Sequence, residues 1–255
     1  MLKESTYQTP CGKIHYWSSI LSLDTTTLIF LPGLTADHRL FDKQVEYFEG
    51  KYNIIVWDAP AHASSWPFRF DFDLFDKAKW LNGILEKEEI IKPIIIGQSM
   101  GGYVGQAYAQ LYPDQLAGFI SIDSAPLQRN YVTAVEIWLL KRMEPIYAHY
   151  PWKLLLKSGT EGVATSSYGR NLMREMMLVY DGNQSGPMTT SSARTLAGSP
   201  EGEKLKTGPG ASSAMAMVRG SSAFKIATPL LRRPWIISLL ARATASTEPK
   251  PPMWA

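Results

Sequence analysis

Short apolar runs alternate with helical patterns over the first half of the chain. Runs of β-branched and aromatic residues predict strands at 13–19, 26–31, 53–57, 93–96 and 117–122. Apolar positions at helical spacing predict helices over about 37–48, 72–88 and 100–112. Strands that are apolar throughout and alternate with helices are typical of a parallel sheet covered on both faces. We therefore expect an α/β fold built on a mostly parallel sheet.

The alternation stops near residue 130. From there to Tyr180 the sequence shows long helical patterns rich in Trp, Met and Tyr. An all-helical insertion after a strand-helix-strand series predicts a cap over the carboxyl ends of the strands. The expected organisation is an α/β core over 1–125, a helical cap over 126–181 and a separate tail over 182–255.

The tail differs sharply in composition from the rest of the chain. Of its last 71 residues, 42 are Ala, Ser, Thr, Gly or Pro, and residues 185–255 contain neither Asp nor His. Only residues 229–240 have the apolar character of a buried element. We therefore expect the last strands of the sheet to be missing, the strand that precedes Asp123 to be an exposed edge, and most of the tail to be without fixed structure.

Composition and charge narrow the class of protein. A chain of 255 residues with 45% hydrophobic residues fits one globular domain with an insertion. The formal net charge of +3 divides into −3 for residues 1–184 and +6 for the tail, where scattered Arg and Lys form no nucleic-acid motif. A single cysteine, no leader-like start and no run long enough to span a membrane indicate a cytoplasmic protein that binds neither membrane nor nucleic acid.

A serine motif lies between a predicted strand and a predicted helix. Residues 97–101, Gly-Gln-Ser-Met-Gly, match the pattern G-x-S-x-G, in which a sharp turn exposes the serine hydroxyl and small neighbours leave room for the turn. Ser99 is thus the candidate nucleophile. The backbone N–H of Met100, at the start of the helix, is a candidate oxyanion donor. The N–H of Leu34, in the Pro-Gly loop after an earlier strand, is the candidate for a second donor.

Residues 13–181 resemble the α/β-hydrolase family. The resemblance rests on LPGLTADHRLF after a strand, on WDAPAHASS, and on IIIGQSMGGYVGQAYAQLYPDQLAGFISIDSAPL, in that order. It implies a Ser-acid-His triad, with the acid after a late strand and the histidine in a final loop. It also implies a cofactor-free and metal-free reaction on a small-molecule substrate.

The sequence departs from that pattern in its last third, where no histidine or aspartate is present. Asp123 follows the strand after the nucleophile helix, a position at which some members carry the acid. His38 and His62 follow earlier strands and are the fallback candidates for the base, although each has a simpler interpretation as a loop-shaping residue. His15 and His149 are expected to be structural.

Two functions fit these observations. The first is a serine hydrolase that acts on a small ester, thioester or amide through an acyl-enzyme at Ser99, with impaired turnover. The second is a non-catalytic binding protein, or the product of a gene disrupted by a shift of reading frame near codon 181, that retains the fold. Translation of the coding DNA beyond that codon in the other two frames separates the explanations of the tail, because an intact gene fragment would supply a strand followed by Gly-x-x-Asp and then Gly-His. The sequence does not indicate the oligomeric state.

Overall fold

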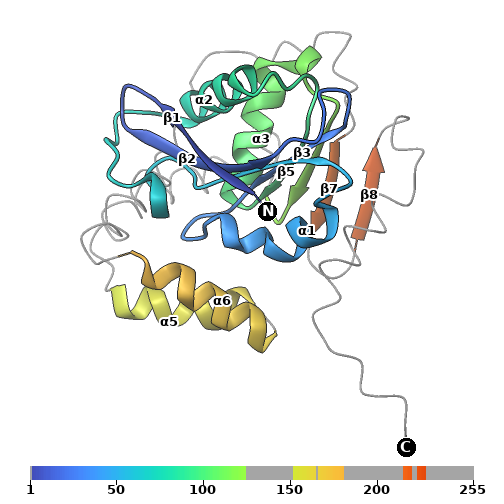
Figure 1. Ribbon diagram of the computed structural model, residues 1–255. Coiled ribbons are helices and arrows are strands. Elements are labelled where there is room, and N and C mark those ends of the chain that lie inside the picture. The colour runs from blue at the N-terminus through green and yellow to red at the C-terminus, as the bar shows by residue number, and fades with distance from the viewer. Residues whose placement is uncertain (1, 125–151, 165, 181–214, 220–222, 228–255) are drawn as a thin grey trace, which may run out of the picture.

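A computed structural model describes residues 2–124, 152–164, 166–180, 215–219 and 223–227 (Figure 1). Its centre is one eight-stranded sheet with the order β1-β2-β4-β3-β5-β6-β7-β8. The strands are β1 (Lys3–Gln8), β2 (Lys13–Ser19), β3 (Thr27–Leu31), β4 (Asn53–Trp57), β5 (Ile94–Gln98), β6 (Gly118–Ile122), β7 (Met215–Arg219) and β8 (Ala223–Ala227).

The middle of the sheet is parallel, which confirms the predicted α/β class. β3 pairs in parallel with β4 and β5, and β5 pairs in parallel with β6, whereas β1 and β2 pair antiparallel at one edge. Every residue of β3 and β4 is buried. This explains why these strands are apolar throughout, since both of their faces are covered. The carboxyl ends of the parallel strands consequently meet at one edge of the core.

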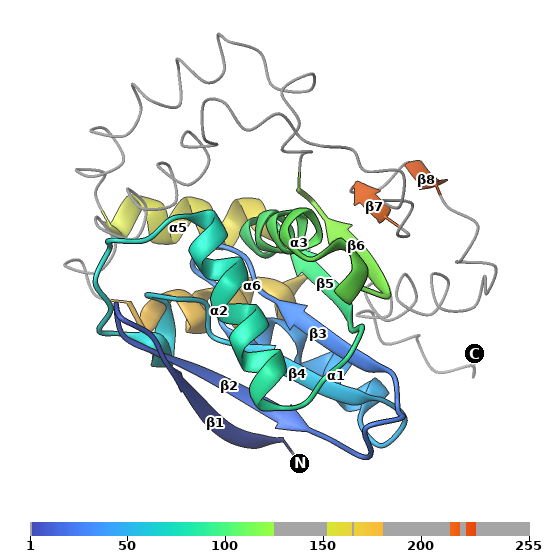
Figure 2. The same cartoon turned by 90° about the horizontal axis from the view of Figure 1, so that it is seen from above.

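Helices cover both faces of the sheet (Figure 2). On one face lie α2 (Leu74–Lys87) and α3 (Met100–Leu111), which share a core with β2, β3, β4 and β5. On the other lie the 3-10 helix η1 (His38–Phe41) and α1 (Asp42–Phe48), which contribute to a second core. The 3-10 helices η2 (Ala63–Ser65) and η3 (Pro113–Gln115) lie in the connections. Asp73 caps α2 in a reciprocal capping box with Asp76, as expected for an acidic cluster before a helix.

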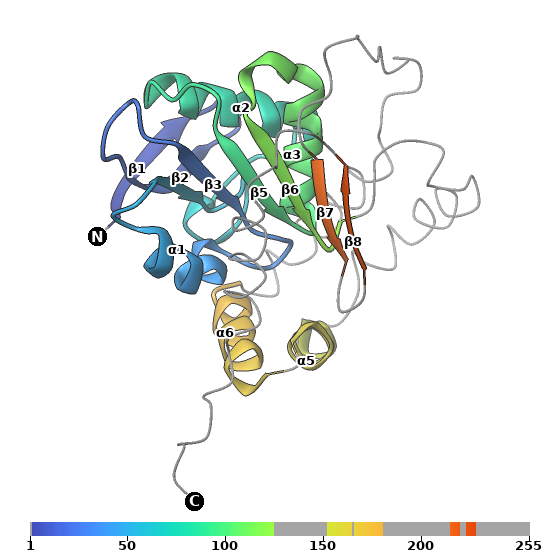
Figure 3. The same ribbon diagram turned by 90° about the vertical axis from the view of Figure 1, so that its right-hand side faces the viewer.

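The helical pair α5 (Trp152–Val163) and α6 (Ser167–Leu178) lies at the carboxyl ends of the parallel strands (Figures 1 and 3). Met173, Met176 and Met177 of α6 form a buried cluster with Ala36, in the loop after β3. The hydroxyl of Tyr180 also lies 3.4 Å from the carbonyl of Ala36. The described part of the helical insertion therefore packs on the loop that follows β3.

Residues 215–219 and 223–227 of the tail, where no strand was predicted, form β7 and β8. β7 pairs in parallel with β6, and β8 pairs antiparallel with β7, so β6 is not an edge strand (Figure 3). Both strands have five residues, and Gly-Ser-Ser, a turn-type composition, separates them in the sequence. These strands, MAMVR and AFKIA, are short and lack the run of β-branched residues from which the other strands were predicted.

β1 was also missed, because KESTYQ has almost no apolar residues and is buried only in part. Cys11 is buried, with its thiol 3.3 Å from the carbonyl of Asp71.

Residues 229–240, His149 and the remainder of the tail lie outside the described residues, as does the first part of the predicted cap. Within the described residues, no helix combines the length and the apolar character that a membrane span requires.

Candidate active site

Ser99 occupies a strained turn between β5 and α3. Its backbone has φ 50° and ψ −113°, a conformation that residues other than glycine rarely adopt. Glycines on both sides make the turn sterically feasible, since a Cβ on Gly97 would collide with the carbonyl of Gly101, and a Cβ on Gly101 would collide with that of Leu31. The spacing of the motif is thus a packing requirement, and the observed turn is the one that G-x-S-x-G predicts.

Hydrogen bonds from the end of β6 hold the backbone of Ser99 on both sides. The Ser99 N–H donates to the carbonyl of Ile122 at 2.8 Å, and the hydroxyl of Ser124 donates to the Ser99 carbonyl at 2.7 Å. Asp123 lies between these two contacts in the sequence and has φ 51°. The candidate acid is therefore in a strained loop that adjoins the candidate nucleophile.

The loop after β3 approaches the nucleophile from the other side. A Cβ built on Gly33 would lie 3.2 Å from the Cβ of Ser99, so any larger residue at position 33 would crowd the serine. Leu34 follows directly and is partly buried against the core, and Met100 is buried at the start of α3. Both candidate oxyanion donors therefore belong to segments that flank Ser99.

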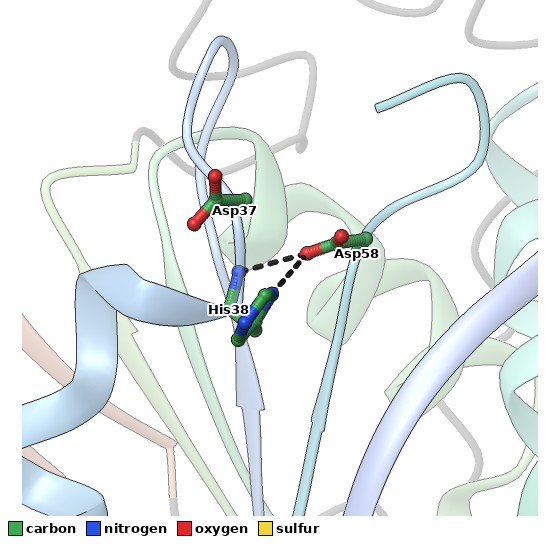
Figure 4. A group of neighbouring side chains, drawn as sticks. All are labelled: Asp37, His38 and Asp58. Carbon is green, nitrogen blue, oxygen red and sulfur yellow. Dashed lines mark hydrogen bonds and ion pairs between the residues drawn. The ribbon is translucent and has the colours of Figure 1, made fainter. Parts of the chain in front are cut away.

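His38 is paired with Asp58, which lies directly after β4 (Figure 4). The Nδ1 atom and the backbone N–H of His38 each lie 2.9 Å from Oδ1 of Asp58. The His38 ring also stacks on Trp17, with ring centroids 3.7 Å apart. These contacts fix the ring and its Nδ1 proton, because a carboxylate accepts.

Charge shifts both members of this pair toward their ionised forms. Burial lowers the pKa of His38, but the hydrogen bond and charge of Asp58 outweigh burial and raise the pKa above its ordinary value. Burial likewise raises the pKa of the Asp58 carboxyl, yet the bonds from His38 and the N–H of Ser64 bring it below its ordinary value. His38 therefore has the electrostatic environment of a base held by a carboxylate.

Asp37, His38 and Asp58 are also the one described group of three side chains that could hold a metal ion, with ligand atoms within 4.8 Å of one another. Protein groups already engage these atoms. Asp37 accepts three hydrogen bonds from the guanidinium of Arg39, with Oδ2 to Nη2 at 2.6 Å, and caps η1 through the Arg39 N–H. The cluster is thus satisfied as a network of charged hydrogen bonds.

His62 lies in a different environment, in the loop after β4. Its Nδ1 donates to the carbonyl of Pro60 at 2.9 Å, while Nε2 is buried and has no hydrogen-bond partner among the described residues. Burial and the nearby charge of Lys77 lower the pKa of His62 to about 4. Both neighbours, Ala61 and Ala63, have positive φ. His62 is consequently a neutral and weakly basic imidazole near pH 7.

The structure gathers Ser99 with the segments of Met100, Leu34 and Asp123 at the carboxyl ends of β3, β5 and β6. The contacts of His38 and His62 lead instead to Asp58, Trp17 and Pro60, and no described histidine hydrogen-bonds to the Ser99 hydroxyl.

Sequence reasoning missed Lys77, a buried lysine on α2 whose Nζ lies 3.5 Å from the sulfur of Met100. The one available signal was its place on the apolar face of the helix, between Leu74, Ala78 and Leu81.

A strained serine at the end of a central parallel strand, followed at once by a helix, defines the class of protein. The family model for the alpha/beta hydrolase fold matches residues 26–172, more than half of the chain. The chain belongs to the α/β-hydrolase fold family.

Two curated proteins resemble parts of this chain. An uncharacterized hydrolase, YugF, from Bacillus subtilis is 28% identical over 111 residues, which cover 43% of this chain and 41% of that protein. The 3-oxoadipate enol-lactonase 2 of Acinetobacter baylyi is 29% identical over 106 residues, covering 40% and 38%. The chain therefore matches about two fifths of the length of these curated relatives.

Solved structures share the fold. A thermophilic esterase from Thermogutta terrifontis superposes with a TM-score of 0.64 at 19% identity, covering 86% of this chain and 79% of that one. A carboxylesterase structure from Nitrososphaera gargenis gives 0.64 at 13% identity, covering 94% and 99%. Identities this low support the shared fold alone.

Proposed function

We propose that this chain is a serine hydrolase that cleaves a small ester, thioester or amide through an acyl-enzyme at Ser99. The observation that carries the proposal is the backbone of Ser99, held at φ 50° between β5 and α3. Strain of this kind persists only where surrounding structure enforces it, and it clusters at functional sites. The hydrolase, lactonase and esterase names of the relatives support the same reaction class.

In this mechanism the Ser99 hydroxyl attacks the carbonyl carbon of the substrate. The carbonyl oxygen becomes an oxyanion, which the N–H groups of Leu34 and Met100 stabilise together with the amino end of α3. Asp123 is the proposed acid. The proposed fallback base is His38 rather than His62, because Asp58 raises the pKa of His38 whereas that of His62 is about 4.

We further propose that turnover is low, because no described histidine contacts the Ser99 hydroxyl and the last 71 residues contain none. Without a base in contact with the nucleophile, catalysis depends on the oxyanion donors and falls by about 10³ or more relative to an intact triad. The alternative is a non-catalytic binding protein, or a disrupted gene product, that retains the fold. If turnover is absent, the low pKa of His62 and the hydrogen bonds of His38 to Asp58 support that alternative.

Hydrolysis of p-nitrophenyl acetate tests the proposal. The wild-type chain should hydrolyse the ester slowly and Ser99→Ala should not exceed the uncatalysed rate. The matched control Ser64→Ala, which changes an exposed serine of η2, should behave as wild type. Equal rates for the wild-type chain and Ser99→Ala would favour the non-catalytic alternative. A rate typical of an intact triad would show that a base does reach Ser99, and His38→Gln would then be the first variant to examine.

A further inference from the structure

Lys77 is a buried cation with no anion beside it in the described part of the chain. The residue is 1% exposed, and its ammonium donates to the thioether sulfur of Met100 at 3.5 Å. The Phe72 ring lies 5.5 Å away. A thioether and a ring face are weak partners for an ammonium, and among the described residues no carboxylate lies within ion-pair distance of Lys77.

The neighbouring titratable groups do not offset this charge. His62 faces Lys77 from the loop after β4 and is itself neutral, because burial and Lys77 lower its pKa. The Asp58 carboxylate, which interacts with His62, is already engaged by His38 and Ser64. An uncompensated charge in the interior is costly, and burial lowers the pKa of Lys77 to about 8.

The position of Lys77 indicates what such a charge could act on. Met100, which it contacts, is the residue after Ser99 and the first residue of α3. In the proposed reaction, the bond from Ser99 Oγ to the carbonyl carbon forms, the electron pair of the carbonyl moves to its oxygen, and the hydroxyl proton passes through solvent water to His38, the proposed fallback base. Negative charge thus develops beside the Met100 N–H, in an interior where charges interact far more strongly than in water.

We propose that Lys77 is an electrostatic residue of the Ser99 site, whose buried ammonium stabilises the oxyanion from behind Met100 without touching the substrate. This inference rests on the proposed function. It explains why an ammonium is retained where an apolar side chain would pack at lower cost: its counter-charge exists only while the oxyanion does. Residues that cost stability and serve a transition state are expected at active sites.

The test uses the Ser99-dependent rate of p-nitrophenyl acetate hydrolysis by the full chain, which is the wild-type rate minus that of Ser99→Ala. At pH 7, Lys77→Met should lower the kcat of this rate by about tenfold with little change in KM. Lys79→Met is the matched control, since Lys79 lies on the same helix but is exposed, and its rate should equal the wild-type rate. If Lys77→Met does not fold cooperatively, Lys77→Gln takes its place.

The pH dependence separates charge from packing. Lys77 loses its proton as the pH rises through about 8, so the ratio of wild-type to Lys77→Met rates should fall from about ten at pH 7 toward one at pH 10. A ratio near one at pH 7, or a ratio that is the same at both pH values, would overturn the inference and leave the proposed function intact. Equal rates for the wild-type chain and Ser99→Ala would instead overturn the proposed function, and the inference with it.

Discussion

Two sets of buried polar side chains, Asp58 in the first and Lys77 with His62 in the second, differ greatly in how many hydrogen-bond partners they have. Asp58 is fully buried, and its side chain accepts from the backbone N–H groups of His38 and Ser64 and from the His38 ring. Lys77 and His62 are equally buried, yet Lys77 has a sulfur as its acceptor and Nε2 of His62 has no partner among the described residues. The hydrogen bonds of Asp58 tie two loops together, whereas the Lys77 ammonium lies beside the side chain of Met100, the residue after Ser99. A fully satisfied buried group is accounted for by its hydrogen bonds, whereas an incompletely satisfied one requires another explanation.

The largest expected effect is the loss of stability when the Asp58 carboxylate is removed. Asp58→Ala should lower the free energy of unfolding by about 3 to 5 kcal/mol, because it leaves three donors without their acceptor. Urea denaturation of the full chain measures this. Asp24→Ala, at an exposed loop position, should change the free energy by less than about 0.5 kcal/mol. A loss below about 1 kcal/mol for Asp58→Ala would contradict a stabilising role for the hydrogen bonds of Asp58.

Substitution of Lys77 is expected to change the free energy of unfolding in the opposite direction. Lys77→Met should raise the free energy of unfolding by about 1 to 2 kcal/mol, because an apolar side chain of similar length replaces a buried charge with no anion beside it among the residues that the structure describes. The exposed control Lys79→Met should leave stability unchanged or slightly lower, as it removes the surface ion pair with Asp76. If Lys77→Met instead destabilised the chain by more than about 1 kcal/mol, the ammonium would have a structural partner after all.

A smaller effect concerns pH. The pKa of His38 is raised in the folded chain, so its stabilising charge is fully present below about pH 6.5 and is lost as the pH rises through the folded pKa. The pKa of Asp58 is lowered, so its contribution is present above about pH 4 and is lost as the pH falls further.

The stability difference between the wild-type chain and His38→Gln should therefore be largest, about 1 to 2 kcal/mol, between pH 4 and 6.5. It should decrease toward pH 9. Thermal denaturation of both proteins across this range measures the difference, and His62 contributes equally to both. A difference that grew toward pH 9 would contradict the assigned pairing.

Much of the fold was predictable because its central elements follow simple periodicities. β3 and β4 are apolar throughout because both faces are buried, and α2 begins at an acidic capping box. β1, β7 and β8 were missed because strands of five or six residues at the ends of a sheet need no continuous apolar run. Their positions are set by pairing with a neighbour that is distant in sequence, which local patterns do not encode.

The candidate site was predictable to the extent that backbone sterics dictate its residues. Gly97 and Gly101 are required by the carbonyls that surround the turn at Ser99, so the motif could be recognised from the sequence. Lys77 could not be recognised, because a lysine on the apolar side of a helix normally extends to solvent, and only tertiary packing against Met100 shows that this one does not. The pairing of His38 with Asp58 likewise joins two loops 20 residues apart.

Covalent labelling tests the central claim, that Ser99 is a nucleophile displayed on a strained turn without an efficient base. The full chain is incubated with a fluorophosphonate, and the modified peptide is identified by mass spectrometry. One adduct should form slowly on Ser99 and none in Ser99→Ala, at a rate about 10³ or more below that of an intact Ser-His-Asp enzyme. An adduct that forms equally in Ser99→Ala, or a folded chain that labels as fast as an intact triad enzyme, would contradict it.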